Sequence, residues 1–310
     1  MRHSITFLLA VGLAATTLAA PQAKGRKAPA TPPPAPPIDL SKPEGVVAAN
    51  RKMACSLEDG KAVVFWWKGS AYSRVPGERD RALFNVEGMN IRQCGTVKDP
   101  QRGDGYRLVS REILLFLDPE TGKPLEKWKN PWTGKENEVV HVANDPVNGP
   151  PSFPIGRDGA PVKWRGNIMK GRLWTTGEAP LFYKNALGGE YQDYVGGEYH
   201  AMEMLTMFGY LKDVLDASQK EAHDLTIAWA RTSDWLPWME MGDRVGMMIY
   251  STVGKRLANA NDLSPLLKDE IAKNYPAYAA PPPLDDARPN ETSWTYFKKK
   301  IDAKRKEDAK

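Results

Sequence analysis

Two glutamates in apolar, strand-like segments are the first candidates for acid–base chemistry. In the segment Tyr106–Asp118, alternation places Glu112 on the same face as Leu114, and in Leu83–Cys94 it places Glu87 among apolar residues. Burial raises the pKa of a carboxyl group, which is the condition for a general acid or base near neutral pH. If the opposite faces point inward, both glutamates are solvated, and the period of two does not distinguish these alternatives.

Histidines provide a second set of candidates. His141 lies in an apolar run, and His200 follows a turn of two glycines. No pair of histidines has the i, i+4 spacing of a helical metal site and no HExxH motif occurs, so no metal site is predicted. Two alternatives stay open: the two histidines meet a carboxylate in space and act in catalysis, or they are structural.

The segment Arg231–Arg244 has an unusual composition, with one tryptophan on each side of a proline and three carboxylates. Trp235 and Trp238 offer large apolar faces that suit an aromatic or apolar ligand. We therefore take both tryptophans as candidate ligand-binding residues. Two further candidates are Glu240, which follows the tryptophans, and Tyr106, which alternation places on the same face as Glu112. Asp234 joins the candidate acids and bases. The alternative is that the tryptophans plug one end of a barrel.

Composition and charge exclude several classes of protein. The chain has 310 residues, and its net charge of +5 comes from 43 basic and 38 acidic residues. The basic excess lies in the two flanks and the body is nearly neutral, which argues against a nucleic-acid-binding face. No GxSxG, Walker or GxGxxG motif occurs, so no cofactor is predicted.

The N-terminus has the pattern of a secretory signal peptide. A short basic start precedes an uncharged apolar run over Ile5–Ala20, and small residues follow as far as Ala23. We assign residues 1–23 to this signal and 24–43 to a proline-rich linker, which predicts a periplasmic or secreted protein without a transmembrane segment in the mature chain. The alternative is a retained membrane anchor.

Export permits a disulfide between the two cysteines, Cys55 and Cys94. The alternative is two buried free thiols.

Turn signals and short apolar runs predict the fold of residues 44–283. Six dipeptides ending in glycine are typical of hairpin turns: Asp59-Gly60, Lys68-Gly69, Asp104-Gly105, Thr121-Gly122, Thr133-Gly134 and Asp158-Gly159. The strands expected besides Leu83–Cys94 and Tyr106–Asp118 are Ala62–Trp67, Ala71–Val75, Glu138–Ala143, Val162–Trp174, Asp224–Thr232 and Arg244–Thr252. Such a chain is mainly β, an antiparallel meander closed as a calycin- or lipocalin-like barrel or folded as a sandwich.

Helices are expected near the C-terminus. Ser264 is a good N-cap and Pro265 suits the first helical position, so a helix begins there and ends before Pro276. Residues 284–310 form a C-terminal unit with a helix over Ser293–Lys306 and a basic tail. The segment Tyr199–Leu211 is compatible with helix or strand, and we favour strand.

Three motifs resemble a known family. They are Trp128–Gly134, His141–Asn148 and Arg231–Arg244, and they look like those of the bacterial domain-of-unknown-function family eighteen thirty-eight, known mostly from exported proteins. The resemblance covers about residues 44–283. It implies a shared fold and a bacterial source, and it implies no reaction.

Three functions remain in view. The protein binds a small apolar or aromatic molecule in a barrel cavity; or it is a cofactor-independent lyase, isomerase or hydratase that uses the carboxylates and histidines named above; or it is an envelope interaction protein with a filled barrel.

We predict cleavage of the signal peptide between Ala19 and Ala23, because small residues follow the apolar run there. N-terminal sequencing of the protein from its native host checks this, and a mature protein that begins at Met1 contradicts it.

Overall fold

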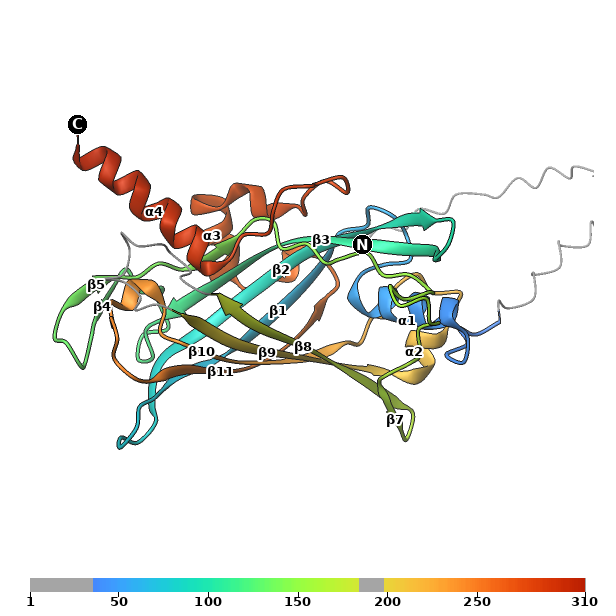
Figure 1. Cartoon of the computed structure of the whole chain (residues 1–310), viewed down its shortest axis with the longest axis horizontal. Coiled ribbons are helices and arrows are strands. Elements are labelled where there is room, and N and C mark those ends of the chain that lie inside the picture. The colour runs from blue at the N-terminus through green and yellow to red at the C-terminus, as the bar shows by residue number, and fades with distance from the viewer. Residues whose placement is uncertain (1–35, 184–197, 310) are drawn as a thin grey trace, which may run out of the picture. The chain divides into compact units, whose positions relative to one another are not determined.

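A computed structural model describes residues 36–183 and 198–309 of the chain, and its main feature is one antiparallel sheet (Figure 1). Nine strands follow in the order β6-β3-β2-β1-β11-β10-β9-β8-β7. Their bounds are β1 Val63–Arg74, β2 Arg81–Asp99, β3 Gly103–Leu117, β6 Val142–Asn144, β7 Asn167–Met169, β8 Arg172–Tyr183, β9 Tyr199–Tyr210, β10 Thr226–Ser233 and β11 Met247–Leu257. The mainly β, antiparallel class expected from the sequence is confirmed.

The remaining elements are short strands and helices. A separate hairpin joins β4 (Lys127–Lys129) to β5 (Glu136–Glu138). The helices are α1 Pro43–Ala54, α2 Leu211–Leu215, α3 Pro265–Asn274 and α4 Ser293–Asp308, with 3-10 turns η2 Pro237–Met239, η3 Ala260–Asp262 and η4 Pro276–Ala279. Both predicted C-terminal helices are confirmed, and the Ser264 hydroxyl accepts the Leu267 N–H as an N-cap.

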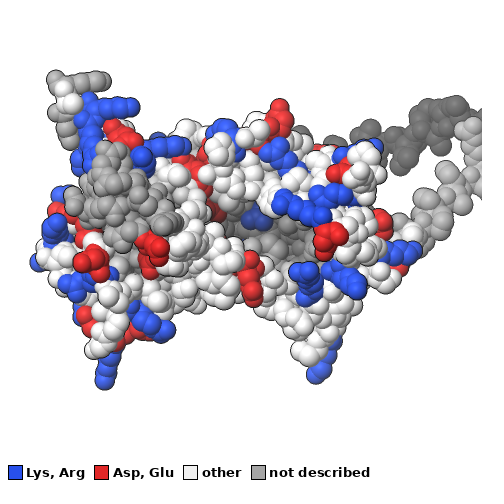
Figure 2. Space-filling view, viewed as in Figure 1, with Lys and Arg blue, Asp and Glu red and all other residues white. Residues whose placement is uncertain are grey.

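The sheet is curled without being closed into a barrel. Four strands separate β3 from β9 in the sheet order, yet side chains of both line one internal cavity. Within the described residues, the strands at the two ends of the sheet order, β6 and β7, do not pair with each other. The hydrogen-bonded closure of a calycin-like barrel is therefore missing. The face in Figure 2 is hollowed near its centre, and a basic side chain is visible inside the hollow.

The two faces of the sheet have different partners. On the concave face, apolar side chains of the central strands form two clusters that fill most of the space. On the convex face, Leu267 and Ile271 of α3 pack in a third cluster with Met89, Ile113 and Leu115. Because both faces are covered over β2 and β3, these strands carry buried apolar side chains on both sides.

Two glycines allow β1 and β11 to approach closely. A Cβ atom at Gly69 would lie 2.0 Å from the Ser251 carbonyl oxygen, and one at Gly254 would lie 1.9 Å from that of Trp66. Gly69 therefore permits the close approach of β1 to β11 and does not form a turn. The predicted turn at Lys68-Gly69 is wrong, and β1 continues through it.

Other boundary predictions need correction. Asp104-Gly105 lies inside β3, since the preceding turn uses Gly103 at φ 86°. The expected strand Val162–Trp174 is a hairpin that turns at Gly171, and Glu138–Ala143 is divided between β5 and β6. The glycines of the other four predicted turns have positive φ, as such turns require. The strand favoured over Tyr199–Leu211 is confirmed as β9.

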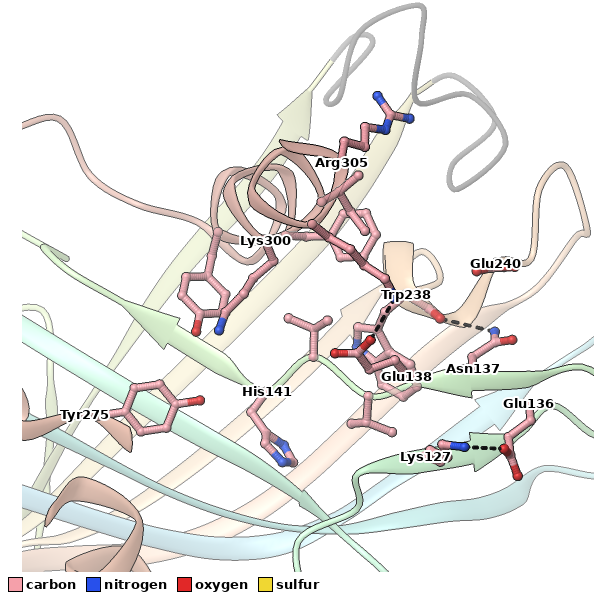
Figure 3. Close-up of a pocket in the computed structure, with 16 residues that line it drawn as sticks. Lys127, Glu136, Asn137, Glu138, His141, Trp238, Glu240, Tyr275, Lys300 and Arg305 are labelled. Atoms are coloured by element: carbon pink, nitrogen blue, oxygen red, sulfur yellow. Dashed lines mark hydrogen bonds and ion pairs between the residues drawn. The ribbon is translucent and has the colours of Figure 1, made fainter. Parts of the chain in front are cut away.

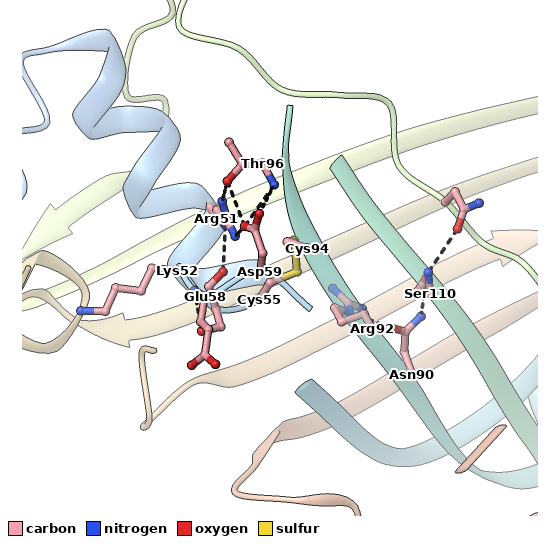
Figure 4. The surroundings of a disulfide bond; sticks show 12 residues. Arg51, Lys52, Cys55, Glu58, Asp59, Asn90, Arg92, Cys94, Thr96 and Ser110 are labelled. Atoms are coloured by element: carbon pink, nitrogen blue, oxygen red, sulfur yellow. Dashed lines mark hydrogen bonds and ion pairs between the residues drawn. A yellow bond between two sulfur atoms is a disulfide. The ribbon is translucent and has the colours of Figure 1, made fainter. Parts of the chain in front are cut away.

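A disulfide attaches the end of α1, a helix that the sequence analysis did not predict, to the sheet, and a buried lysine attaches α1 to α2 (Figure 4). Cys55 and Cys94 are bonded, with their Cα atoms 5.9 Å apart, which confirms the pairing that the sequence permitted. Lys52 is fully buried, and its Nζ donates to the carbonyl oxygens of Asp213 and Asp216, each at 2.6 Å. These contacts fix α1 and α2 at one end of the sheet.

The chain packs against the fold before residue 44. Ile38 donates its N–H to the Leu215 carbonyl oxygen, and Ile38 and Leu40 contact the cluster around α1, although the sequence assigned them to the linker. The signal peptide over 1–23 lies outside the described residues. In the described ranges, no helix combines the length and apolarity needed to cross a bilayer.

Replacing both cysteines by alanine (C55A/C94A) is expected to lower the free energy of unfolding by about 3–4 kcal/mol, because the bridge closes a loop with a sequence separation of 39. Urea unfolding of the oxidised wild type and the double variant measures the difference. Dithiothreitol destabilises only the wild type if the bridge is responsible, and an equal response of both proteins contradicts this account.

Candidate functional site

The curled sheet encloses a cavity of about 140 Å³ on its concave face. Most of its wall is apolar and comes from β1, β3, β6, β9 and β10: Phe65, Trp67, Ile113, Leu114, Val142, Leu205, Met207, Ile227 and Trp229. Five polar residues complete the lining: Asn90, Arg92, Glu112, Glu203 and Arg231. Two arginines and two glutamates inside an apolar sheet mark this cavity as the candidate site.

Arg231 is the centre of one polar group. Its Nη1 donates to Glu203 Oε1 at 2.7 Å across the β9–β10 ladder, and its Nη2 donates to the Tyr199 hydroxyl. Burial opposes the charge of Arg231, but Tyr199, Glu203 and Tyr250 outweigh it and hold the pKa of the guanidinium above its usual value. Arg231 is therefore a fixed cation.

Glu112 belongs to a second polar group on β2, β3 and β6. Asn144 Nδ2 donates to Glu112 Oε1 at 2.8 Å, and Arg92 Nε donates to Asn90 Oδ1 at 2.7 Å. Burial lowers the pKa of Arg92 to about 10, against the opposing effect of the Glu112 charge, so Arg92 stays protonated at neutral pH. Each charged group in the cavity thus has a polar neighbour, as buried charges require.

Burial, and after it the charge of Glu203, raises the pKa of Glu112 above its ordinary value. The arrangement can hold a proton on Glu112 within reach of fixed positive charge. Two donors on lining residues, Trp67 Nε1 and Arg231 Nε, are buried without a hydrogen-bond partner among the described residues. The cavity therefore has hydrogen-bonding capacity that the protein itself does not use.

Of the predicted carboxylates, only Glu112 faces the cavity. The register pairs Asn90 with Glu112 and Glu87 with Leu115, so the two glutamates point to opposite faces of the sheet. Glu87 lies on the convex face, 5% exposed, and accepts a hydrogen bond of 2.8 Å from Trp66 Nε1. Neither alternative left open by the sequence, both glutamates inward or both solvated, describes the structure, because alternation along each strand does not relate one strand's face to the next.

His200 and Asp234 form a contact away from the cavity. The Asp234 carboxylate accepts the backbone N–H of His200 at 2.7 Å and lies 3.4 Å from its Nδ1. The His200 side chain is 61% exposed. This pair joins the start of β9 to the residue that follows β10. Among the described residues, no group of three His, Cys, Asp or Glu side chains is arranged to hold a metal ion.

A second hollow, of about 560 Å³, lies beneath α4 and brings together three other predicted residues (Figure 3). His141, Trp238 and Glu240 all line this α4 cleft. His141 Nδ1 accepts the Phe116 N–H at 3.1 Å, and burial lowers the pKa of the imidazole to about 4. His141 and His200 therefore do not share a site.

The tryptophans of the Arg231–Arg244 segment close one end of the curled sheet. Trp238 is 4% exposed, and its ring centre lies 5.4 Å from that of Phe116. The ring centres of Trp235 and Trp132 are 5.1 Å apart. Neither tryptophan lines the internal cavity. Tyr106 packs in the cluster around the disulfide, also outside the cavity.

The sequence analysis missed most residues of the internal cavity. Arg92, Glu203 and Arg231 were not candidates, although each alternates with apolar residues in its strand. The signal that could have found Arg231 is the series Ile227, Trp229, Arg231, in which a charge interrupts an apolar face.

His141 is expected to make stability depend on pH. Its pKa falls from 6.5 to about 4 on folding, so the unfolded chain binds more protons between these values and stability drops as pH falls through this window. The contribution is up to about 3 kcal/mol. Unfolding titrations from pH 7 to pH 4 should show this drop in the wild type and a flatter profile in His141→Asn, and parallel profiles contradict it.

The comparisons with known proteins concern the family and not the activity. No curated protein matches the chain. Among solved structures, the crystal structure of Ail, the attachment invasion locus protein of Yersinia pestis, aligns with 64% of this chain and 100% of that chain at 8% identity. The TM-score of this alignment is 0.15, which is too low to indicate a shared fold. The family model described as "Protein of unknown function (DUF1838)" matches residues 60–301. That match covers most of the chain and agrees with the motifs read from its sequence: the protein belongs to the DUF1838 family.

Proposed function

We propose that this protein binds a small, partly apolar molecule in the internal cavity on the concave face of its sheet. The observation that carries the proposal is the convergence of Arg92, Glu112, Glu203 and Arg231 on one cavity whose other walls are apolar. Burying charged groups costs desolvation free energy, so their presence in an apolar cavity favours a functional role there. Recognition of a ligand's polar group is such a role.

The size of the cavity limits the ligand. A cavity of about 150 Å³ accommodates a molecule such as benzene, and this one has about 140 Å³. Trp67 and Trp229 offer faces for a planar or aliphatic body. The polar part is a hydroxyl or carbonyl oxygen, because Arg92 and Arg231 supply donors.

The proposal includes two further expectations. The protein is exported, with residues 1–23 removed, and the curled sheet acts as a calycin-like barrel whose ends are covered by α1 and by the tryptophan segment. The third hypothesis, an envelope interaction protein, expects a filled interior, and the cavity argues against it.

Acid–base catalysis is a second candidate function, favoured by the raised pKa of Glu112 beside Glu203. A neutral carboxylic acid next to a carboxylate can give a proton to one atom of a ligand while the other group removes one. A lyase, isomerase or hydratase without a cofactor needs such a pair.

Calorimetric titration with benzene-sized phenols, alcohols and carbonyl compounds tests the binding proposal. Leu205→Trp places an indole in the cavity and should weaken binding of every compound that the wild type binds by more than about tenfold. Val253→Trp is the matched control, because Val253 is 65% exposed and should leave binding unchanged. A wild type that binds none of the compounds, or equal binding by both variants, contradicts the proposal.

The catalytic candidate requires proton exchange with a bound compound. In deuterated buffer, the wild type should exchange carbon-bound protons next to the carbonyl of a bound ketone, and Glu112→Gln should lose this exchange while still binding the ketone. Proton NMR measures both, and equal exchange rates in the two proteins leave binding as the function.

A further inference from the structure

The α4 cleft differs from the internal cavity in size, walls and charge. It lies between helix α4 and residues 136–141, and its volume is about 560 Å³. One wall is apolar: Ile301 is partly exposed there, and the rings of Trp238 and Phe297 are almost entirely buried. None of these three side chains lines the internal cavity, so the cleft is a separate place where a ligand could bind.

The carboxylates of the cleft already have cationic partners. Glu136 pairs with Lys127 at 2.9 Å and Glu138 with Lys304 at 3.3 Å. Glu240 pairs with Lys135 at 3.5 Å.

One cation of the cleft has a different environment. Lys300 Nζ lies 5.4 Å from the ring centre of Tyr296, and no carboxylate in the described ranges lies within ion-pair distance of it. The cleft therefore contains a positive charge that the described carboxylates do not neutralise.

A neutral hydrogen-bond donor lies on the same side of the cleft as Lys300. His141 Nδ1 accepts a backbone N–H, which leaves its Nε2 to carry the proton of the neutral ring. Figure 3 shows Tyr275 and Lys300 on the same side of the cleft as His141. This part of the cleft thus combines the ammonium group of Lys300 with the N–H of His141, and an anion is the group that such donors recognise.

We propose that the α4 cleft is a second binding site, which takes a small aromatic carboxylate. The ring of the ligand lies against Tyr296 and Ile301, whose side chains are partly exposed, near the buried Trp238, and its carboxylate lies toward Lys300 and His141. This site is independent of the ligand proposed for the internal cavity.

Benzoate and its neutral analogue benzamide are the probes, followed through the indole N–H signals in two-dimensional NMR, with each signal assigned by a single Trp→Phe variant. We expect benzoate to shift the Trp238 signal and to bind at least about tenfold more tightly than benzamide, because the charge-assisted contact exists only for the carboxylate. Lys300→Met should weaken benzoate binding by a similar factor and leave benzamide unchanged. Lys300 is exposed, so this change should not affect folding.

Lys306→Met is the matched control, since it removes one positive charge from the exposed side of the same helix and should leave benzoate binding unchanged. Equal binding of benzoate and benzamide, or of benzoate by wild type and Lys300→Met, overturns the proposal. So does binding of inorganic phosphate as tight as that of benzoate, because the aromatic wall then contributes nothing. Shifts confined to Trp67 and Trp229 would place the ligand in the internal cavity, which refutes the α4 cleft and leaves the proposal for that cavity standing.

Discussion

The alternation of side chains along β2 and β3 is the constraint on which the architecture depends. In the buried central part of these strands, successive side chains face alternately the concave side and the C-terminal helices. The pairing of Asn90 with Glu112 puts these two polar side chains inside, and the pairing of Glu87 with Leu115 puts that glutamate outside. A shift of register by one residue would move Glu112 beneath α3 and bring Leu115 into the cavity. The chemistry of the cavity is therefore a property of strand register.

Charges on the concave face are tolerated because they come as matched groups from different strands. Arg231 and Glu203 are directly opposite each other on β10 and β9, so the ladder itself holds the ion pair. Glu112 has Asn144 of β6 as its neighbour and is far from these strands in the sheet order. Only the curl of the sheet brings the two groups to one cavity, and a flat sheet of the same strands would separate them. The shape of the sheet and the electrostatics of the cavity are thus coupled.

Much of the fold could be predicted from the sequence, and the candidate site could not. Local signals such as the N-cap at Ser264 and the glycine turns depend on neighbouring residues, and most of them were correct. Gly69 misled because a glycine needed for close strand contact looks the same in sequence as a turn glycine. Arg92 and Arg231 are distant in the chain and line one cavity only because the sheet curls, which no local pattern contains. The composition of the segment Arg231–Arg244 made it a candidate ligand-binding segment. Two of its residues, Trp238 and Glu240, line the α4 cleft together with His141.

The outer edge of β8 has a consequence for self-association. Beyond the three residues paired with β7, no strand of the described chain covers this edge. Pro180 lies opposite Met202 of β9, and in an antiparallel ladder a residue without an N–H is tolerated where that N–H would point away from the neighbour. The missing donor therefore falls on the open side, and Gly177 nearby offers no side chain for a further strand to pack against. An edge with these two residues is a poor template for another chain, which protects a protein with an open sheet from adding strands of its neighbours at high concentration.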